Sequence, residues 1–340
     1  MALSPARTTL VGWLTLVALM ALFIGLGLLK LIVFLLFMHL VIDLVVTALG
    51  GRVPFVSKRV VLYVACIVVA AGVVALALVV LPDFLADVPD YIRLVDSKLA
   101  GKVGELLTSW GVSFDLGELK LKAIEWGRAH LPESFDLAKR AGTNVVLLVF
   151  SFVMTIISMH DRLTRTHPSP LPAEADNLWA YLARFLREKI GEFYGFFRQV
   201  MGGQVIISAI NAGLTFGLLV VLGIPHKVAL TVMVFVFGLL PIVGNLISNT
   251  LICISALLSA GPIQVIAALV FLVVVHKLEY FLNSKIIGNV VKLPVLITLL
   301  GLIVGEALFR ISGMILAVPI ILFIRAQLRA VRTDFMRNAS

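Results

Sequence analysis

Long apolar runs separated by short polar breaks organise this chain. The first four runs cover residues 10–29, 31–49, 60–81 and 143–159. Each is about 17–22 residues long, enough for a helix to cross roughly 30 Å of hydrocarbon. The pattern therefore predicts four membrane-spanning helices. We expect residues 1–81 to form an N-terminal scaffold of transmembrane helices.

A polar segment interrupts the apolar pattern at residues 82–142. It carries ten acidic and eight basic residues and is broken by several glycines and prolines. This composition predicts a small helical insert outside the hydrocarbon. The fourth span follows it, and residues 176–200 then mix basic and aromatic positions at helical spacing. That mixture is typical of an amphipathic helix in a membrane interface, so residues 143–200 are expected to hold one span and one cytoplasmic interfacial helix.

The distribution of basic residues predicts the orientation of the chain. Lysine and arginine concentrate in cytoplasmic loops of membrane proteins. Placing the basic clusters in the cytoplasm puts the insert outside the cell and both termini inside. The clusters are Arg52, Lys58 and Arg59; Arg162 and Arg165; Arg184, Arg187 and Lys189; and Arg325, Arg329, Arg332 and Arg337.

The C-terminal half alternates ordinary spans with interrupted ones. Ordinary spans are expected at 205–222 and 263–282, each followed by an apolar unit with a break in its middle. The breaks lie at residues 238–245 and 306–313. Counting the crossings gives the two span-plus-hairpin units opposite senses, as in the inverted repeats of secondary transporters.

We therefore predict an all-α polytopic membrane protein of about eight membrane segments. These include two broken-helix hairpins in an inverted repeat, plus the small extracytoplasmic insert. Residues 201–327 would form the transport domain, and residues 328–340 a basic cytoplasmic tail. Whether the hairpins are re-entrant or fully spanning stays open at this point.

Composition excludes several classes of protein. Of the 340 residues, 61% are hydrophobic and only 14% charged, against roughly 25% charged in soluble domains. The two cysteines, Cys66 and Cys253, both lie in apolar runs, so we expect neither a disulfide framework nor a metal site. The net charge of +9 is spread over loop ends, which predicts no nucleic-acid partner. No cofactor and no cleavable signal are expected, and membrane lipids are the expected surroundings.

Polar and helix-breaking residues at the interruptions are the first candidates for a binding site. Pro241 removes a backbone donor and Gly244 permits close approach, so the first break can present free backbone groups to a ligand. Asn245 and Asn249 flank that break. They are the asparagines chosen as substrate contacts, although asparagine in a span often joins helices instead.

Ionisable residues in apolar spans are functional candidates because they are costly in lipid. Glu279 can take a proton or a cation, or can pair locally with a neighbouring lysine. Glu306 and Arg310 are four residues apart at the second break. They can form an intrahelical pair that is either structural or opens to hold a polar substrate. His39 and Asp43 are also four residues apart. They can form a proton relay, or they can be a satisfied interhelical or interfacial pair.

Several segments taken together resemble the autoinducer-2 exporter family. They are the Leu-Pro241-Ile-Val-Gly244 break, residues 278–288 around Glu279 and Asn283, Leu293-Pro294, the Gly301–Gly305 segment, residues 312–319, and the insert after the third span. The likeness runs from about Leu10 to Arg332 and is most specific in the C-terminal half. The chain departs from the family's commoner glycine-rich pattern at Phe309-Arg310-Ile311.

The resemblance implies a function and an assembly. It adds Asn283 and Pro294 to the candidate substrate contacts. It also implies a multi-pass protein of the bacterial inner membrane that forms homo-oligomers, with a pentamer among the sizes it allows. In such an oligomer we expect residues 1–81 to supply contacts between subunits. The implied activity is export of autoinducer-2, a small polyhydroxylated quorum-sensing signal, or alternatively Na⁺/H⁺ exchange.

Other classes are weighed against a secondary transporter for a small polar solute. An ATP-driven pump would need a G-x-x-x-x-G-K-[ST] stretch, which the sequence lacks. An intramembrane enzyme would need a nucleophile with a base in reach, and neither G-x-S-x-G nor H-E-x-x-H occurs. We therefore expect no enzymatic activity. A channel or scaffold that does not transport remains the other alternative.

Overall fold

The computed structural model describes residues 5–50, 57–75, 134–164, 177–240, 243–259, 262–282 and 293–339, together with positions 78 and 82. In these ranges every regular element is a helix, which confirms the all-α prediction. Most of the predicted insert lies outside the described residues. The helices are α1 (Pro5–Gly25), α2 (Leu29–Gly50), α3 (Lys58–Ala75), α6 (Ser134–Thr164), α7 (Leu178–Val221), α8 (Lys227–Gly238), α9 (Val243–Ser259), α10 (Pro262–Leu282) and α11 (Val295–Ala339).

Seven of the described helices are long and apolar enough to cross a membrane: α1, α2, α3, α6, α7, α10 and α11. The two shorter apolar helices, α8 and α9, follow each other along the chain. With 12 residues, α8 is about 18 Å long, well short of the roughly 30 Å hydrocarbon core. The polytopic membrane class is therefore confirmed, and α8 by itself is too short to cross.

The chain divides into two compact units. The first holds residues 1–70, 143–202 and 291–340. Within it, α2, α3 and α6 pack through an apolar cluster that includes the buried Ile42, Leu62 and Cys66. Arg198 of α7 pairs with Asp43 of α2, with the guanidinium Nε 2.8 Å from Oδ2. This contact satisfies Asp43 across two helices.

Aromatic side chains join α1, α7 and α11 within this first unit. The indole of Trp13 lies edge-on to Phe185, with ring centroids 5.5 Å apart. Phe323 of α11 contacts Phe193 of α7 in a similar edge arrangement at 5.9 Å. Gly12 gives the Phe185 ring its room, since a Cβ there would lie 2.9 Å from it. Glycine at position 12 is thus required by packing.

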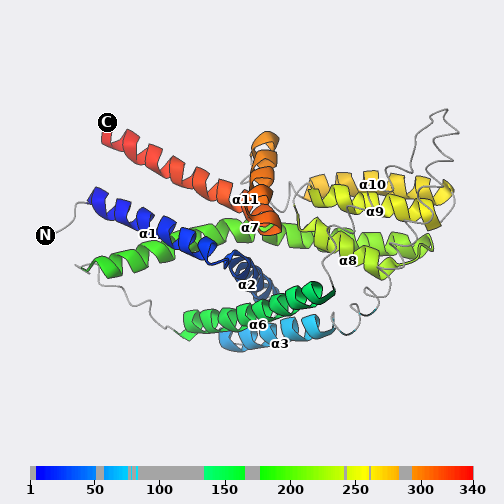
Figure 1. Ribbon diagram of the computed structural model, residues 1–340, viewed down its shortest axis with the longest axis horizontal. Helices are drawn as coiled ribbons and strands as arrows, with labels where there is room; N and C mark the ends of the chain where they lie inside the picture. Colours follow the sequence, from blue (N-terminus) through cyan, green and yellow to red (C-terminus); the bar gives the residue numbers. More distant parts are fainter. Residues whose placement is uncertain are drawn as a thin grey trace. The chain divides into compact units, whose positions relative to one another are not determined.

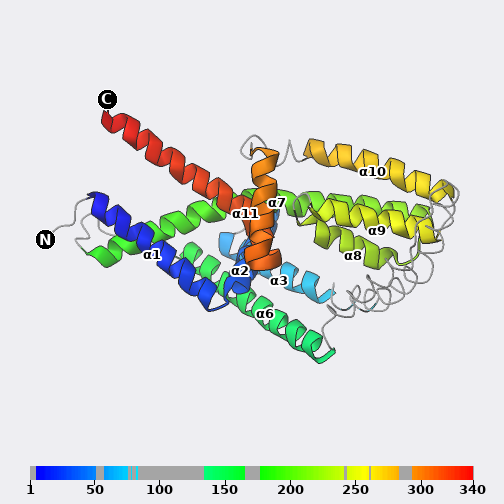
Figure 2. The same ribbon diagram turned by 45° about the horizontal axis from the view of Figure 1, so that its top comes forward.

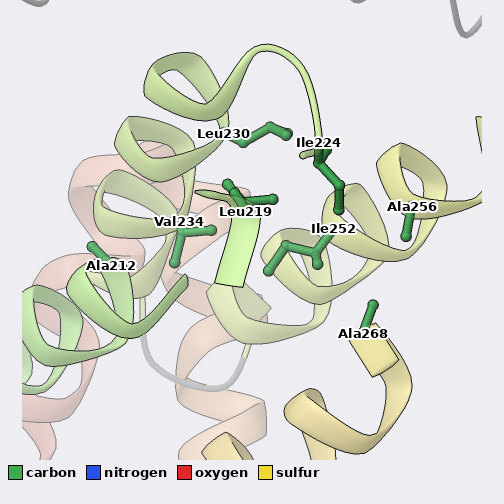
Figure 3. Close-up of a cluster of buried hydrophobic side chains, with 8 residues drawn as sticks. All are labelled: Ala212, Leu219, Ile224, Leu230, Val234, Ile252, Ala256 and Ala268. Carbon is green, nitrogen blue, oxygen red and sulfur yellow. The ribbon is translucent and has the colours of Figure 1, made fainter. Parts of the chain in front are cut away.

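The second unit holds residues 71–142 and 203–290. Its four described C-terminal segments, the end of α7 with α8, α9 and α10, run beside one another in both views (Figure 1, Figure 2). Figure 3 shows the apolar cluster that holds them together. It gathers Ala212 and Leu219 of α7, Ile224 of the following turn, Leu230 and Val234 of α8, Ile252 and Ala256 of α9, and Ala268 of α10.

The segments predicted as an interfacial helix at 176–200 and a span at 205–222 are joined in one uninterrupted helix, α7, of 44 residues. Gly202 and Gly203 do not break it because both are buried inside the helix, where packing outweighs the low helix propensity of glycine. The segment predicted as a basic cytoplasmic tail, 328–340, is helical as far as Ala339, where α11 ends, and its cytoplasmic location stays a prediction.

Candidate functional site

Four polar side chains form a stripe along one face of α7. They are Gln204, Ser208, Asn211 and Thr215, and the intervals of four, three and four residues place them on one side of a helix. All four are buried, with 5%, 1%, 6% and 2% of their surface exposed. Burying a polar group is costly unless it finds a hydrogen-bond partner. The partners of this stripe, called the α7 stripe below, therefore indicate what it is for.

The end of α8 closes on one end of the α7 stripe. The amide Nε2 of Gln204 donates a hydrogen bond of 2.5 Å to the carbonyl oxygen of Gly238. Gly238 is the last residue of α8, so its carbonyl lacks a partner in its own helix. A Cβ at this position would lie 2.8 Å from the Ser208 hydroxyl oxygen. Glycine thus lets the helix end approach α7 closely enough for the glutamine to reach it.

The backbone is also tightly packed at the first break, where α8 ends and α9 begins. A Cβ on Gly244 would fall 1.6 Å from the carbonyl oxygen of Phe237, so only glycine fits at the start of α9. The amide of Gly244 donates to the carbonyl of Leu240 at 3.1 Å. Pro241 lies outside the described residues, and so does the side chain of Asn245. Gly244 therefore shapes the turn through its missing side chain.

A small cavity lies where α7, α8, α9 and α10 meet. Its volume is about 10 Å³, roughly the space of one water molecule. Polar groups line it from three helices: Asn211 and Thr215 of α7, Ser248 and Asn249 of α9, and His276 and Glu279 of α10. Five apolar residues complete the wall: Val234, Ile252, Phe271, Leu272 and Val275. The cavity is thus an oxygen-rich space within apolar helices.

Two oxygen atoms of the α7 stripe are buried with no hydrogen-bond partner among the described residues: Ser208 Oγ and Asn211 Oδ1. Asn211 lines the cavity directly. Glu279, also lining it, has only 8% of its surface exposed. Unsatisfied buried groups are rare in native proteins and each needs an explanation. An open acceptor beside a buried carboxyl suits a ligand that donates hydrogen bonds or carries positive charge.

The predicted site residues divide between the two units. Asn249 and Glu279 meet at the cavity of the second unit. Asn283 lies outside the described residues. Pro294, Glu306 and Arg310 belong to the first unit, and all three are exposed in the described chain. Their predicted contact with substrate stays a prediction.

The second break is a sharp bend at Arg310. This residue has φ 54° and ψ −139°, far from helical values, and it divides α11 into two arms, as the bend in Figures 1 and 2 shows. A Cβ on Gly313 would lie 1.9 Å from the carbonyl oxygen of Gly305, so the two arms touch backbone to backbone. The hairpin predicted at the second break is present.

The bend also removes the helical geometry expected for Glu306 and Arg310. Arg310 leaves the helix, so its side chain is not placed one turn beyond that of Glu306. No ion pair joins the two among the described residues, and both side chains are exposed. The intrahelical pair is therefore not formed, because the backbone turns at its second member.

The α7 stripe was not among the predicted site residues. Pro241, Gly244 and the asparagines beside the break were predicted, whereas Gln204, Ser208 and Thr215 were not. The available signal was a run of polar residues at intervals of four, three and four in an otherwise apolar span. That periodicity points to a polar helix face. Which element covers the face depends on how α8 folds back.

These features place the protein among helical multi-pass membrane proteins with transporter-like broken helices. The comparisons with known proteins are specific. The model of the AI-2E family transporters matches residues 10–333. The chain therefore belongs to this family.

Two curated relatives share parts of the sequence. One is the "Putative transport protein YdbI" of Bacillus subtilis (strain 168), 32% identical over 163 residues, or 44% of this chain and 47% of the relative. The other is the "Putative transport protein MT0215" of Mycobacterium tuberculosis (strain CDC 1551 / Oshkosh). It is 30% identical over 117 residues, or 34% of this chain and 30% of the relative. The matches span less than half of either relative.

Proposed function

We propose that this protein is a secondary transporter that exports a small polar solute resembling autoinducer-2 across the bacterial inner membrane by alternating access. The observation that carries the proposal is the buried polar site where α7, α9 and α10 meet. In its wall lies Asn211 Oδ1, which has no hydrogen-bond partner in the part of the chain that the structure describes. A hydroxylated, uncharged solute would supply the hydrogen bonds that this oxygen lacks. Small-molecule sites typically combine apolar walls with a few placed polar groups.

The substrate contacts we propose follow from this site. Asn211, Asn249 and Glu279 would bind the solute in the second unit, and Gly244 would keep the first hairpin tight against it. We retain Pro241, Asn245, Asn283, Pro294, Glu306 and Arg310 as proposed contacts during other steps of the cycle. In this proposal residues 201–327 carry the transport path and residues 1–81 form subunit contacts of a homo-oligomer, with both termini in the cytoplasm.

A second candidate is Na⁺/H⁺ exchange, which the size of the cavity favours. About 10 Å³ holds a water or a bare cation but no sugar-sized solute, so export requires a wider conformation. The side chains of Asn211, Thr215, Ser248, Asn249 and Glu279 offer oxygen atoms, the ligands preferred by hard cations. Only Glu279 among them carries negative charge.

Transport by purified protein in proteoliposomes separates the two candidates. Counterflow of labelled autoinducer-2 measures solute export, and the recovery of a pH-sensitive dye after added Na⁺ measures exchange. We expect counterflow that Asn211→Ala lowers at least tenfold, the effect of leaving a substrate donor unpaired. Glu192→Ala serves as the control, because it removes a polar contact to Gln327 in the other unit and lies outside residues 201–327.

Each outcome has a definite meaning. Counterflow that Glu279→Gln leaves intact would remove that carboxyl from solute binding. Dye recovery without counterflow, lost in Glu279→Gln, would establish exchange and refute solute export. A solute flux that shows no counterflow would indicate a channel.

A further inference from the structure

We propose that the α7 stripe is the substrate-contacting surface of the transport path, that the α8–α9 hairpin covers it in the present conformation, and that Gln204 holds this cover closed. The proposal rests on the transporter function above. It adds Gln204, Ser208 and Thr215 to the path and names the element that must move. Ser208 and Thr215 are proposed contacts, whereas Gln204 is a positioning residue.

The unpartnered atoms argue that the α7 stripe is more than an adhesive between helices. Polar residues that join membrane helices do so by hydrogen bonding across the interface. Gln204 does this with Gly238, but Ser208 Oγ and Asn211 Oδ1 have no partner among the described residues. Groups left open in the covered state are available to a ligand once the cover moves.

Within the hairpin, α8 is held at both of its ends, as a cover would be. At one end, the turn from α7 to α8 contains Gly223 and His226 in left-handed conformations, with φ 65° and 57°. At the other, the end of α8 is held by the Gln204 hydrogen bond to a carbonyl that has no helical partner. Between these ends, α8 is a 12-residue helix. The turn can serve as the hinge and Gln204 as the latch.

The polar groups that would be uncovered when the hairpin moves define the class of ligand. Ser208 and Thr215 each offer a hydroxyl that donates and accepts, while Asn211 Oδ1 only accepts. The described wall of the cavity at the far end of the α7 stripe has Glu279 as its only carboxylate and no lysine or arginine. Such a surface suits a small, hydroxyl-rich and uncharged or cationic molecule, and it disfavours an anion.

Thiol reactivity tests the cover without knowledge of the substrate. The full chain, with Cys66 and Cys253 replaced by serine, receives a single cysteine at Ser208 or, as a matched control, at Ile206. Ile206 is on the same helix and 40% exposed, on the face away from the α7 stripe. A small charged thiosulfonate reagent is then applied to protein in liposomes. Charged reagents modify thiols where water reaches them, so only the stripe position reports on opening.

Gln204→Met removes the donor with little change in volume. We expect it to raise the modification rate at Ser208→Cys about two- to tenfold, the population change that corresponds to one net hydrogen bond. Ile206→Cys should keep its rate, and Gln327→Met, which breaks a glutamine contact in the other unit, should leave Ser208→Cys unchanged. Gly238→Ala provides a second route, since its methyl would meet the residue at position 208.

Two outcomes of the thiol-modification experiment would overturn the proposal. An unchanged rate at Ser208→Cys in both Gln204→Met and Gly238→Ala would show that this contact does not control access. An equal rise at Ile206→Cys would indicate general loosening instead of a moving cover. If Gln204→Met fails to fold, Gly238→Ala decides alone. Because the readout is thiol reactivity, failed autoinducer-2 counterflow with intact opening would refute the choice of solute and leave the cover standing.

Discussion

Arg310 holds a backbone conformation that glycine adopts more easily, so Arg310→Gly should stabilise the protein. Its φ of 54° and ψ of −139° lie in a region that a residue with a bulky side chain rarely occupies. Holding such a conformation costs about 1–3 kcal/mol. Glycine lowers this cost but loses about 0.5–1 kcal/mol through the greater freedom of its unfolded chain. The net gain is therefore on the order of 1 kcal/mol.

Loss of the guanidinium should add little to this sum. The Arg310 side chain is exposed, and no ion pair joins it to Glu306 among the described residues. Removing it leaves no buried carboxylate behind, which is the usual source of large losses when a charge is deleted. The stability change should therefore report mainly on the backbone.

Arg310→Ala separates the two effects. Alanine removes the same charge but keeps the Cβ that makes the conformation costly, so we expect Arg310→Gly to exceed Arg310→Ala in stability by about 1 kcal/mol. At Glu306, which is helical and exposed, the order should reverse, with glycine about 1 kcal/mol less stable than alanine. Unfolding of purified protein in detergent, by heat and by denaturant, measures all four variants.

Equal stability of Arg310→Gly and Arg310→Ala would refute the reasoning, because it would mean that the backbone at this bend does not need a left-handed residue. Transport gives an independent reading. Strain often persists at functional sites, so a more stable Arg310→Gly that has lost counterflow would support a transport role for Arg310. Unchanged counterflow would assign it to the bend alone.

Three further predictions address the second hairpin, the orientation and the subunit contacts. Gly313→Ala should greatly lower the yield of folded protein in detergent, since its Cβ would lie 1.9 Å from the Gly305 carbonyl oxygen. Gly213→Ala is the control and should be harmless, because no atom lies within 4 Å of a Cβ there. Equal yields of the two variants would contradict this prediction. Single cysteines at Ser109 and Ser169, positions outside the described residues, should differ in intact cells, with only the first labelled by an impermeant reagent; labelling of Ser169 alone would reverse the topology. A cysteine at the exposed Leu14 of α1 should cross-link between protomers more readily than one at the equally exposed Ile303 of α11, and the opposite preference would remove α1 from the proposed subunit contact.

The sequence by itself determined the class of the protein and the positions of its breaks. Runs of apolar residues as long as a bilayer is thick can only be membrane helices in a chain this poor in charge. Pro241 and Gly244 marked the first break because they disfavour a continuous helix. The second break was marked by Glu306, Arg310 and Gly313 interrupting an apolar run, and the bend does occur at Arg310. Local chemistry was sufficient for these conclusions.

Only the tertiary structure decided which polar groups come together. Gln204 and Gly238 are 34 residues apart, and no local pattern states that the end of α8 returns to α7. The same holds for the cavity, where Asn211, Asn249 and Glu279 meet from three helices. The sequence pattern also did not predict that α7 continues through Gly202 and Gly203, because helix propensity is a weak preference that burial overrides. Spans follow from the chain's own hydropathy, whereas a site between helices depends on packing that brings distant residues into contact.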